Sequence, residues 1–238
     1  MNNKLKFLSL AAGFLLVPSA FAEDDAVQLA VKRLAESGSY EWKSDLQLPT
    51  GQKQAVVIEG RYNFSQGVHV KLSMGKKTLE VAARDGVIVA SIGEEWKPAN
   101  KFTRSDPIHT ALRGSIDFAL PHHTLETIVS KWRNVKEQDD GSFRGKADFK
   151  AANEVLATVL MQGSQPSGAK SASLKATVWL ETGLPQKYLL EFSASKGGSI
   201  LGGQGIEVNA LTTLANIGST TVMLPPEAEA ALQAAKKP

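Results

Sequence analysis

Residues 174–192 read LKATVWLETGLPQKYLLEF, and this stretch decides the fold. Apolar and polar side chains alternate on both sides of a short centre, residues 181–185, which contains Gly183 and Pro185. A period of two places successive side chains on opposite faces of a strand, and a glycine with a proline favours a turn. The stretch therefore predicts a β-hairpin with one apolar face, formed by Leu174, Ala176, Val178, Leu180, Tyr188, Leu190 and Phe192.

The same alternation runs through residues 40–92 in five short segments. Polar or glycine-bearing turns separate these segments, at residues 49–51, 65–67, 75–77 and 84–86. Such short connections leave no room for crossover helices, so we predict antiparallel pairing with one buried and one solvated face. Further strands are predicted at residues 135–137, 143–149, 206–211 and 220–224.

Helical periodicity occurs in four places. Val27, Ala30, Val31 and Leu34 form one stripe of an amphipathic helix, which Gly38 is placed to end. A second helix is expected to start at Asp106-Pro107. Residues 125–132 and 151–161 predict two more, while Pro225-Pro226 is expected to open a short tail. No internal repeat or long linker divides the chain, so residues 23–238 are predicted to form a single α+β domain.

The start of the chain has the three parts of a cleavable signal peptide. Lys4 and Lys6 are followed by an uncharged apolar run over residues 7–17, and Ala20 and Ala22 provide a small-x-small cleavage site. The apolar run is shorter than the roughly 20 residues that span a bilayer. We therefore expect cleavage after Ala22 and a periplasmic or extracellular protein without a transmembrane segment.

The charge balance excludes some classes of partner. Removal of the signal leaves 25 Lys and Arg against 24 Asp and Glu, a net charge of +1. Nucleic-acid binding is not expected, because it requires a concentrated basic face. The chain has no cysteine, so disulfides, a thiol nucleophile and an N-terminal lipid-modified cysteine are excluded.

Catalytic and metal-binding patterns are not found. No Gly-x-Ser-x-Gly or His-Glu-x-x-His motif occurs. The His122-His123 pair is expected at a solvated helix start, because adjacent residues point in different directions and chelate poorly. His69 is expected on the solvated face of its strand. No enzyme activity, metal or cofactor is predicted.

Aromatic and aliphatic side chains gather on one face of the predicted sheet. Either helices cover this face completely as a core, or they cover it incompletely and leave an apolar cleft that binds a small molecule. In the second case the ligand-binding residues are Trp42, Tyr62, Phe64, Leu72, Val178, Tyr188 and Phe192, with Leu190 beside them.

The order of elements resembles a known superfamily. A signal peptide precedes a helix, meander strands and a helical insertion, followed by the hairpin phrase WLETGLPQKY at 179–188 and by LPPEA at 224–228. This order is similar to the LolA/LolB and LppX/LprG-like superfamily of periplasmic lipoprotein carriers and lipid-binding proteins. The resemblance implies a strongly curved antiparallel sheet, an unclosed half-barrel, with helices that cover its concave face.

Two functions follow as expectations. The first is a non-enzymatic periplasmic carrier or sensor that holds a lipophilic ligand (an acyl chain, a lipid or a lipoprotein) between the sheet and the helices. The second is a periplasmic protein-interaction module whose core is filled and holds no ligand, and whose surface docks another envelope protein.

Overall fold

The computed structural model describes residues 23–47, 56–93, 95–102, 120–147, 150, 152, 172–194 and 206–236. The helical elements there are α1 (Glu23–Glu36), the 3-10 turn η1 (Ala99–Lys101), α3 (Pro121–Val129) and α5 (Pro226–Ala235). The strands are β1 (Ser39–Gln47), β2 (Val56–Asn63), β3 (Gly67–Met74), β4 (Lys77–Arg84), β5 (Val87–Ile92), β6 (Trp96–Pro98), β7 (Trp132–Glu137), β8 (Ser142–Ala147), β9 (Ala172–Glu181), β10 (Leu184–Ala194) and β11 (Ile206–Ala215). The predicted signal peptide and the helix expected at 106–112 lie outside the described residues, as does nearly all of the helix expected at 151–161.

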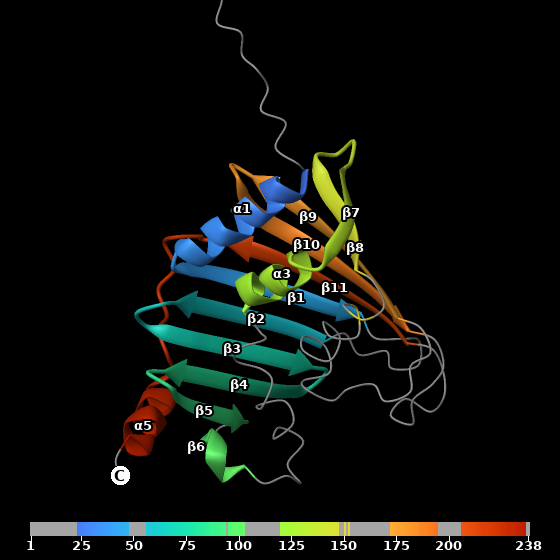
Figure 1. Ribbon diagram of the computed structural model, residues 1–238. Coiled ribbons are helices and arrows are strands. Elements are labelled where there is room, and N and C mark those ends of the chain that lie inside the picture. The colour runs from blue at the N-terminus through green and yellow to red at the C-terminus, as the bar shows by residue number, and fades with distance from the viewer. Residues whose placement is uncertain are drawn as a thin grey trace, which may run out of the picture.

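All eleven described strands belong to one antiparallel sheet (Figure 1). Their spatial order is β6-β5-β4-β3-β2-β1-β11-β10-β9-β8-β7, so β6 and β7 form the two edges and the sheet does not close. The centre is the pairing of β1 with β11, which joins the N-terminal meander to the C-terminal strands. The predicted α+β unclosed antiparallel sheet is confirmed.

The hairpin that decides the fold is formed by β9 and β10. Thr182 and Gly183 make its turn, and both have positive φ, 52° and 76°. Two central residues with positive φ give the type I′ geometry, whose twist matches that of paired strands. Pro185 lies inside β10, where the register shifts between Pro185 and Lys187.

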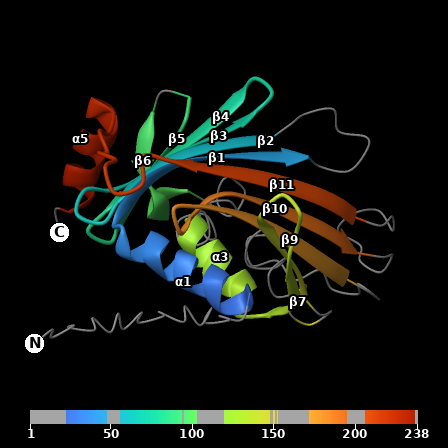
Figure 2. The same ribbon diagram turned by 90° about the horizontal axis from the view of Figure 1, so that it is seen from above.

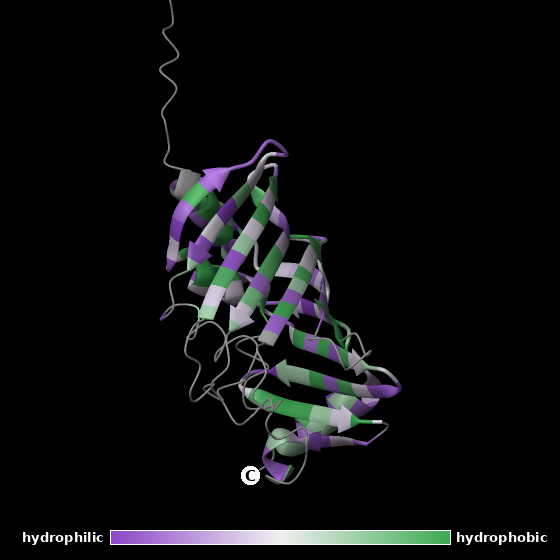
Figure 3. Cartoon of the chain, turned by 90° about the vertical axis from the view of Figure 1, so that its right-hand side faces the viewer, coloured by the Kyte–Doolittle hydropathy of each residue, from purple (hydrophilic) through white to green (hydrophobic). Residues whose placement is uncertain are grey.

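The sheet bends around α1 and α3, which lie on its concave side (Figure 2). Val27 and Leu34 of α1 and Leu125 and Ile128 of α3 are fully buried in one cluster with the apolar side chains of β1 and β7–β11. The strands carry alternating hydrophobic and hydrophilic residues (Figure 3), as the period of two predicts. We call the helix-bearing side the inner face and the opposite side the outer face.

Smaller elements cover the β3–β6 end. η1 and Phe102 pack near Leu79, Val81 and Ala90 of the inner face. Helix α5 packs on the outer face through Ala228 and Leu232, which contact Ala82 and Val89. Within the described residues, no helix is both long and apolar enough to cross a membrane.

Three predicted elements differ from the structure. Trp132 opens β7 rather than ending the helix, which stops at Val129. Residues 220–224 form no strand, and side chains bind their backbone instead: Asn63 Nδ2 donates to the Thr220 carbonyl, and the Val222 N–H donates to Gln66 Oε1. The tail expected after Pro225 is helix α5, which packs on the sheet through Leu232.

Candidate functional site

Six of the seven residues predicted to bind a ligand lie on the inner face. Four of them, Trp42, Val178, Tyr188 and Phe192, are buried in the main core, and Tyr62 and Leu72 are partly buried beside the two inner-face clusters. The expected position of Phe64 on the inner face is wrong. Phe64 lies in the turn after β2 and is 83% exposed, because the strand ends at Asn63 before the alternation can return the ring to the inner face.

The exposure of residues that lie side by side across the strands shows how completely the helices cover the inner face. One such line of residues, the inner row, crosses nine strands in register and consists of Phe143, Val178, Tyr188, Thr212, Ser44, Ile58, Leu72, Leu79 and Ile92. Val178 is 0% exposed, and Phe143, the end of the row on β8, is partly buried. At the other end Ile92 is 51% exposed, while Ile58 and Leu72 are partly buried and Leu79 is buried. Met74, two residues beyond Leu72 on β3, is 37% exposed. The apolar inner face is therefore sealed at β9–β11 and partly open towards β2–β5.

The middle of the inner row is polar but uncharged. Ser44 Oγ and Thr212 Oγ1 are 2.7 Å apart, and Thr212 also hydrogen-bonds the hydroxyl of Tyr188. Burial raises the pKa of Tyr188 to about 12, against a smaller opposite effect of the Thr212 hydrogen bond. Each of these three buried hydroxyls has a hydrogen-bond partner among the other two, so no charged group is needed to stabilise them.

Helix α3 is fastened to the sheet by a hydrogen bond between aromatic groups. The Tyr40 hydroxyl on β1 bonds Nδ1 of His122, and the Tyr62 ring lies 5.3 Å from the Tyr40 ring and 5.4 Å from that of His122. Burial, and secondarily the charge of His123, lowers the pKa of His122 to about 4. Burial also raises the pKa of Tyr40. Both groups are thus neutral near pH 7, and the tautomer of the imidazole sets which of the two donates the hydrogen bond.

Sequence reasoning placed His122 in solvent, and this was wrong, because the residue is only 7% exposed. A signal was present: His122 precedes Leu125 by three residues and Val129 by seven, the spacing of one helical stripe. His123 is exposed, as expected. Among the described residues, no three His, Asp or Glu side chains are grouped so that they could hold a metal ion.

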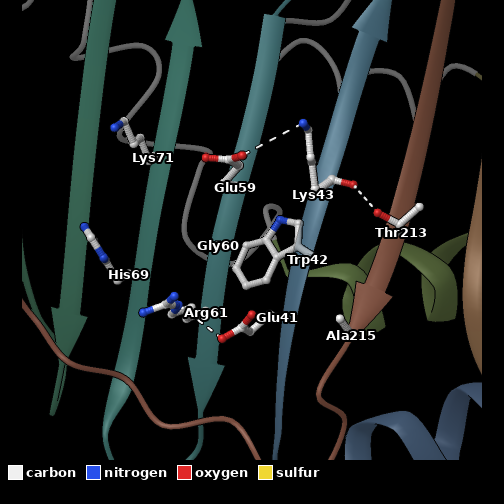
Figure 4. Close-up of a pocket in the computed structure, with 10 residues that line it drawn as sticks. All are labelled: Glu41, Trp42, Lys43, Glu59, Gly60, Arg61, His69, Lys71, Thr213 and Ala215. Atoms are coloured by element: carbon white, nitrogen blue, oxygen red, sulfur yellow. Dashed lines mark hydrogen bonds and ion pairs between the residues drawn. The ribbon is translucent and has the colours of Figure 1, made fainter.

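The outer face carries a polar pocket of about 440 Å³ (Figure 4). It is lined by charged side chains that alternate in sign across the strands, with Trp42, Gly60, Thr213 and Ala215 completing the lining. Two ion pairs cross it, Arg61 to Glu41 at 3.2 Å and Lys43 to Glu59 at 4.0 Å. His69 pairs with Glu80 at 3.0 Å, and Lys71 lies opposite Glu59 in the register. Such a pocket suits a polar ligand or partner and is unsuited to an acyl chain.

No family model and no curated protein matches the chain. Among solved structures, it is similar to an S-type phycobiliprotein lyase from Guillardia theta, with 10% identity over 85% of this chain and 99% of that one, at a TM-score of 0.28. It is also similar to a domain described as a putative outer membrane lipoprotein-sorting protein from Vibrio parahaemolyticus, with 8% identity over 81% and 91% and a TM-score of 0.28. A LolA superfamily protein from Nitrosomonas europaea matches with 9% identity over 86% and 96%, at a TM-score of 0.29.

Two of these three structures carry names from the superfamily that the order of elements resembles. The architecture agrees with that resemblance: the sheet is antiparallel and unclosed, with α1 and α3 on its concave face. TM-scores below 0.3 carry no inference about ligand or site. Function must therefore be argued from the side chains of this chain.

Proposed function

We propose that this protein is an exported, non-enzymatic carrier or sensor that binds a lipophilic ligand between its sheet and helices. The observation that supports this proposal is the uneven cover of the inner row, in which Val178 is 0% exposed and Ile92 is 51% exposed. A protein with a completely filled core gains nothing from leaving apolar side chains of that face in water. The ligand class is an acyl chain, a lipid or the lipid part of a lipoprotein.

Burial of an alkyl chain alone supplies enough affinity. Each methylene transferred from water to an apolar surface contributes about 0.8 kcal/mol, so a chain of eight methylenes contributes about 6 kcal/mol before the cost of ordering it. This sequestration needs no catalytic group and no cofactor. The space between the sheet and the helices would shield the chain from water on the inner face.

The proposed ligand contacts differ in accessibility. Tyr62 and Leu72 are partly buried, so they are proposed as the first contacts of an entering chain. Trp42, Val178, Tyr188 and Phe192 are buried deeper and are proposed to line the inner part of the site. Phe64 is left out because its side chain lies in solvent.

The proposal includes export. Residues 1–22 carry the signal pattern, and residues 23–238 would be the mature single domain in the periplasm. A lipophile carrier in that compartment would operate between two membranes, where a free lipid has no soluble route. This part of the proposal depends on the sequence pattern.

Two measurements test the carrier. Organic extraction of protein purified from the periplasm, followed by mass spectrometry, should release a lipophile in a stoichiometric amount. Purified protein stripped of lipid should take up an apolar fluorescent probe, and Tyr62→Ala should weaken uptake.

Stability separates a ligand contact from a core residue. Tyr62→Ala should cost less than the roughly 3–5 kcal/mol usual for removing a large aromatic side chain from a tight core. Lys71→Ala, which changes the outer face, is the matched control and should alter neither uptake nor stability. A wild-type protein that takes up no probe, together with a Tyr62→Ala variant that unfolds, would contradict the carrier.

A second candidate is an interaction module that holds no ligand. The outer-face pocket, with its alternating Glu41, Arg61, Lys43 and Glu59, favours this candidate as a docking surface for a polar partner. An empty extract and a reproducible co-purifying envelope protein, lost when the pocket charges are reversed, would put this function first.

A further inference from the structure

Trp132 is an indole buried against an apolar part of the sheet. It opens β7, is 6% exposed, and its ring lies so close over Gly145 of β8 that a Cβ atom there would approach it within 2.8 Å. In register it belongs to a second line of inner-face residues, the Trp132 row, formed by Trp132, Ala147, Leu174, Phe192 and Val208. Every member of this row is buried and apolar, and Phe192 is one of the proposed ligand contacts.

The indole nitrogen of Trp132 has an unmet hydrogen bond. Nε1 is buried and finds no acceptor in the part of the chain that the structure describes. Other buried or bound polar groups are paired: Tyr40 with His122, Ser44 with Thr212, and Trp179 Nε1 with Asp140 Oδ2 at 3.0 Å. An N–H that is removed from water without an acceptor destabilises the fold, and native proteins rarely leave one.

We propose that Trp132 Nε1 donates a hydrogen bond to a carbonyl oxygen of the bound lipophile. This inference rests on the proposed carrier function and specifies its ligand class. The acceptor must be uncharged, because the Trp132 row contains no cation and a carboxylate buried there would lack a counter-charge. The ligand is therefore an acyl ester or amide, in which a carbonyl adjoins a long alkyl chain, rather than a plain hydrocarbon.

A pair of matched competitors tests this. The probe is 1-N-phenylnaphthylamine, bound to lipid-stripped protein, and the competitors are methyl laurate and tetradecane, which have the same chain length and are delivered from cyclodextrin. Wild type should bind the ester about five-fold more tightly than the alkane, the effect of one net hydrogen bond. Trp132→Phe keeps an apolar ring without the donor, so it should bind both competitors equally, with the alkane affinity unchanged.

Trp179→Phe is the matched control, since it also removes an indole N–H, but one that already donates to Asp140 and lies outside the proposed site, and it should keep the ester preference. A second readout needs no variant: in ¹H–¹⁵N spectra of wild-type protein, the Trp132 indole proton should move downfield with the ester and stay in place with the alkane. This readout decides the question if Trp132→Phe does not fold.

The experiment distinguishes a failure of the carrier function from a failure of the proposed role of Trp132. If neither the probe nor a competitor binds wild type, the carrier function itself is wrong. If ester and alkane bind wild type equally, or if Trp132→Phe keeps the preference, the carrier stands and the role of Trp132 is overturned. An indole resonance that does not respond to the ester overturns it as well.

Discussion

Gly60 shows how one missing side chain shapes the inner face. It lies opposite Trp42 in the β1–β2 register, and a Cβ at position 60 would overlap the six-membered ring of that indole. The glycine lets the Trp42 ring lie flat across β2, where it is 4% exposed. A residue that weakens a strand in isolation is thus required by the packing of its neighbour.

Gly60→Ala should destabilise the protein by about 1–3 kcal/mol, because the ring or the strand must move to accommodate the methyl group. Urea unfolding measures the loss, and the emission of Trp42 should shift. In Trp42→Phe the smaller ring leaves space, so the same alanine should cost less there, a coupling that a double-mutant cycle detects. Equal costs in the two backgrounds would contradict the contact.

His122 predicts a pH dependence of stability. Its pKa is about 4 in the folded protein and 6.5 ordinarily, so the unfolded chain takes up a proton first as the pH falls. The contribution of the neutral imidazole is therefore complete above pH 6.5 and is lost as the pH falls from 6.5 towards 4. The loss reaches up to about 3 kcal/mol at the acid end.

Denaturant unfolding between pH 7 and 4 measures this slope. His122→Asn is the comparison, since the amide oxygen can accept from Tyr40 near the position of Nδ1 and does not titrate. The wild type should lose more stability than the variant over this range. Parallel pH profiles would show that His122 does not carry the effect.

At the level of elements, different helices cover the two faces of the sheet, and they have different roles. α1 and α3 pack together and close the inner face over β7 and β10, whereas α5 packs on the outer face of β4–β6. Helix α5 is fixed by Leu232 in the apolar contact, by the pair of Arg84 with Glu229 at 2.9 Å, and by Lys236 with Asp85 at 2.7 Å. It should therefore support the fold without touching the proposed ligand.

Leu232→Ala should cost about 2–5 kcal/mol of unfolding free energy, because a 3% exposed leucine is replaced by a cavity. Lys236→Ala removes only an exposed ion pair and should leave stability nearly unchanged. Both variants should take up the apolar probe like wild type at temperatures where they are folded. Reduced uptake by folded Leu232→Ala would mean that α5 takes part in the site.

At the scale of the whole molecule, the eleven described strands form one continuous sheet, and among them β6 and β7 are its two edges. Closure into a barrel would fix the size of the interior, whereas an open sheet leaves the inner face to be covered by helices. The exposure of Ile92 and Met74 shows that this cover is uneven. An incompletely covered inner face is what the proposed carrier function requires.

The signal pattern predicts the N-terminus of the exported protein. N-terminal sequencing of protein recovered from the periplasm should begin at Glu23, because the small residues Ala20 and Ala22 precede it. Replacing Ala22 with a bulky residue should slow processing and leave the larger precursor on a gel. Intact Met1 on membrane-bound material would instead mean a retained anchor and would change the compartment.

The sequence by itself determined the described strands other than β6, their antiparallel pairing and the helix at residues 27–34, although it also predicted a strand at 220–224 that does not form. These features are encoded locally: a period of two, a period of 3.6 and turn residues such as Thr182-Gly183 suffice to specify them. The inner-face positions of Trp42, Tyr62, Leu72, Val178, Tyr188 and Phe192 followed from the same alternation. The position of Phe64 could not be predicted in this way, because the alternation of faces stops where a strand ends. The turn after Asn63 sets that end.

Only the tertiary structure decided which inner-face side chains are buried and which are exposed to solvent, because their burial depends on where α1 and α3 pack. It also decided the burial of His122, whose partner Tyr40 lies 82 residues away, and the placement of Trp132 in β7. A pattern read along the chain contains no long-range partners. The unmet hydrogen bond of Trp132 Nε1, on which the proposed ligand class depends, arises because the indole is buried over Gly145 of the neighbouring strand.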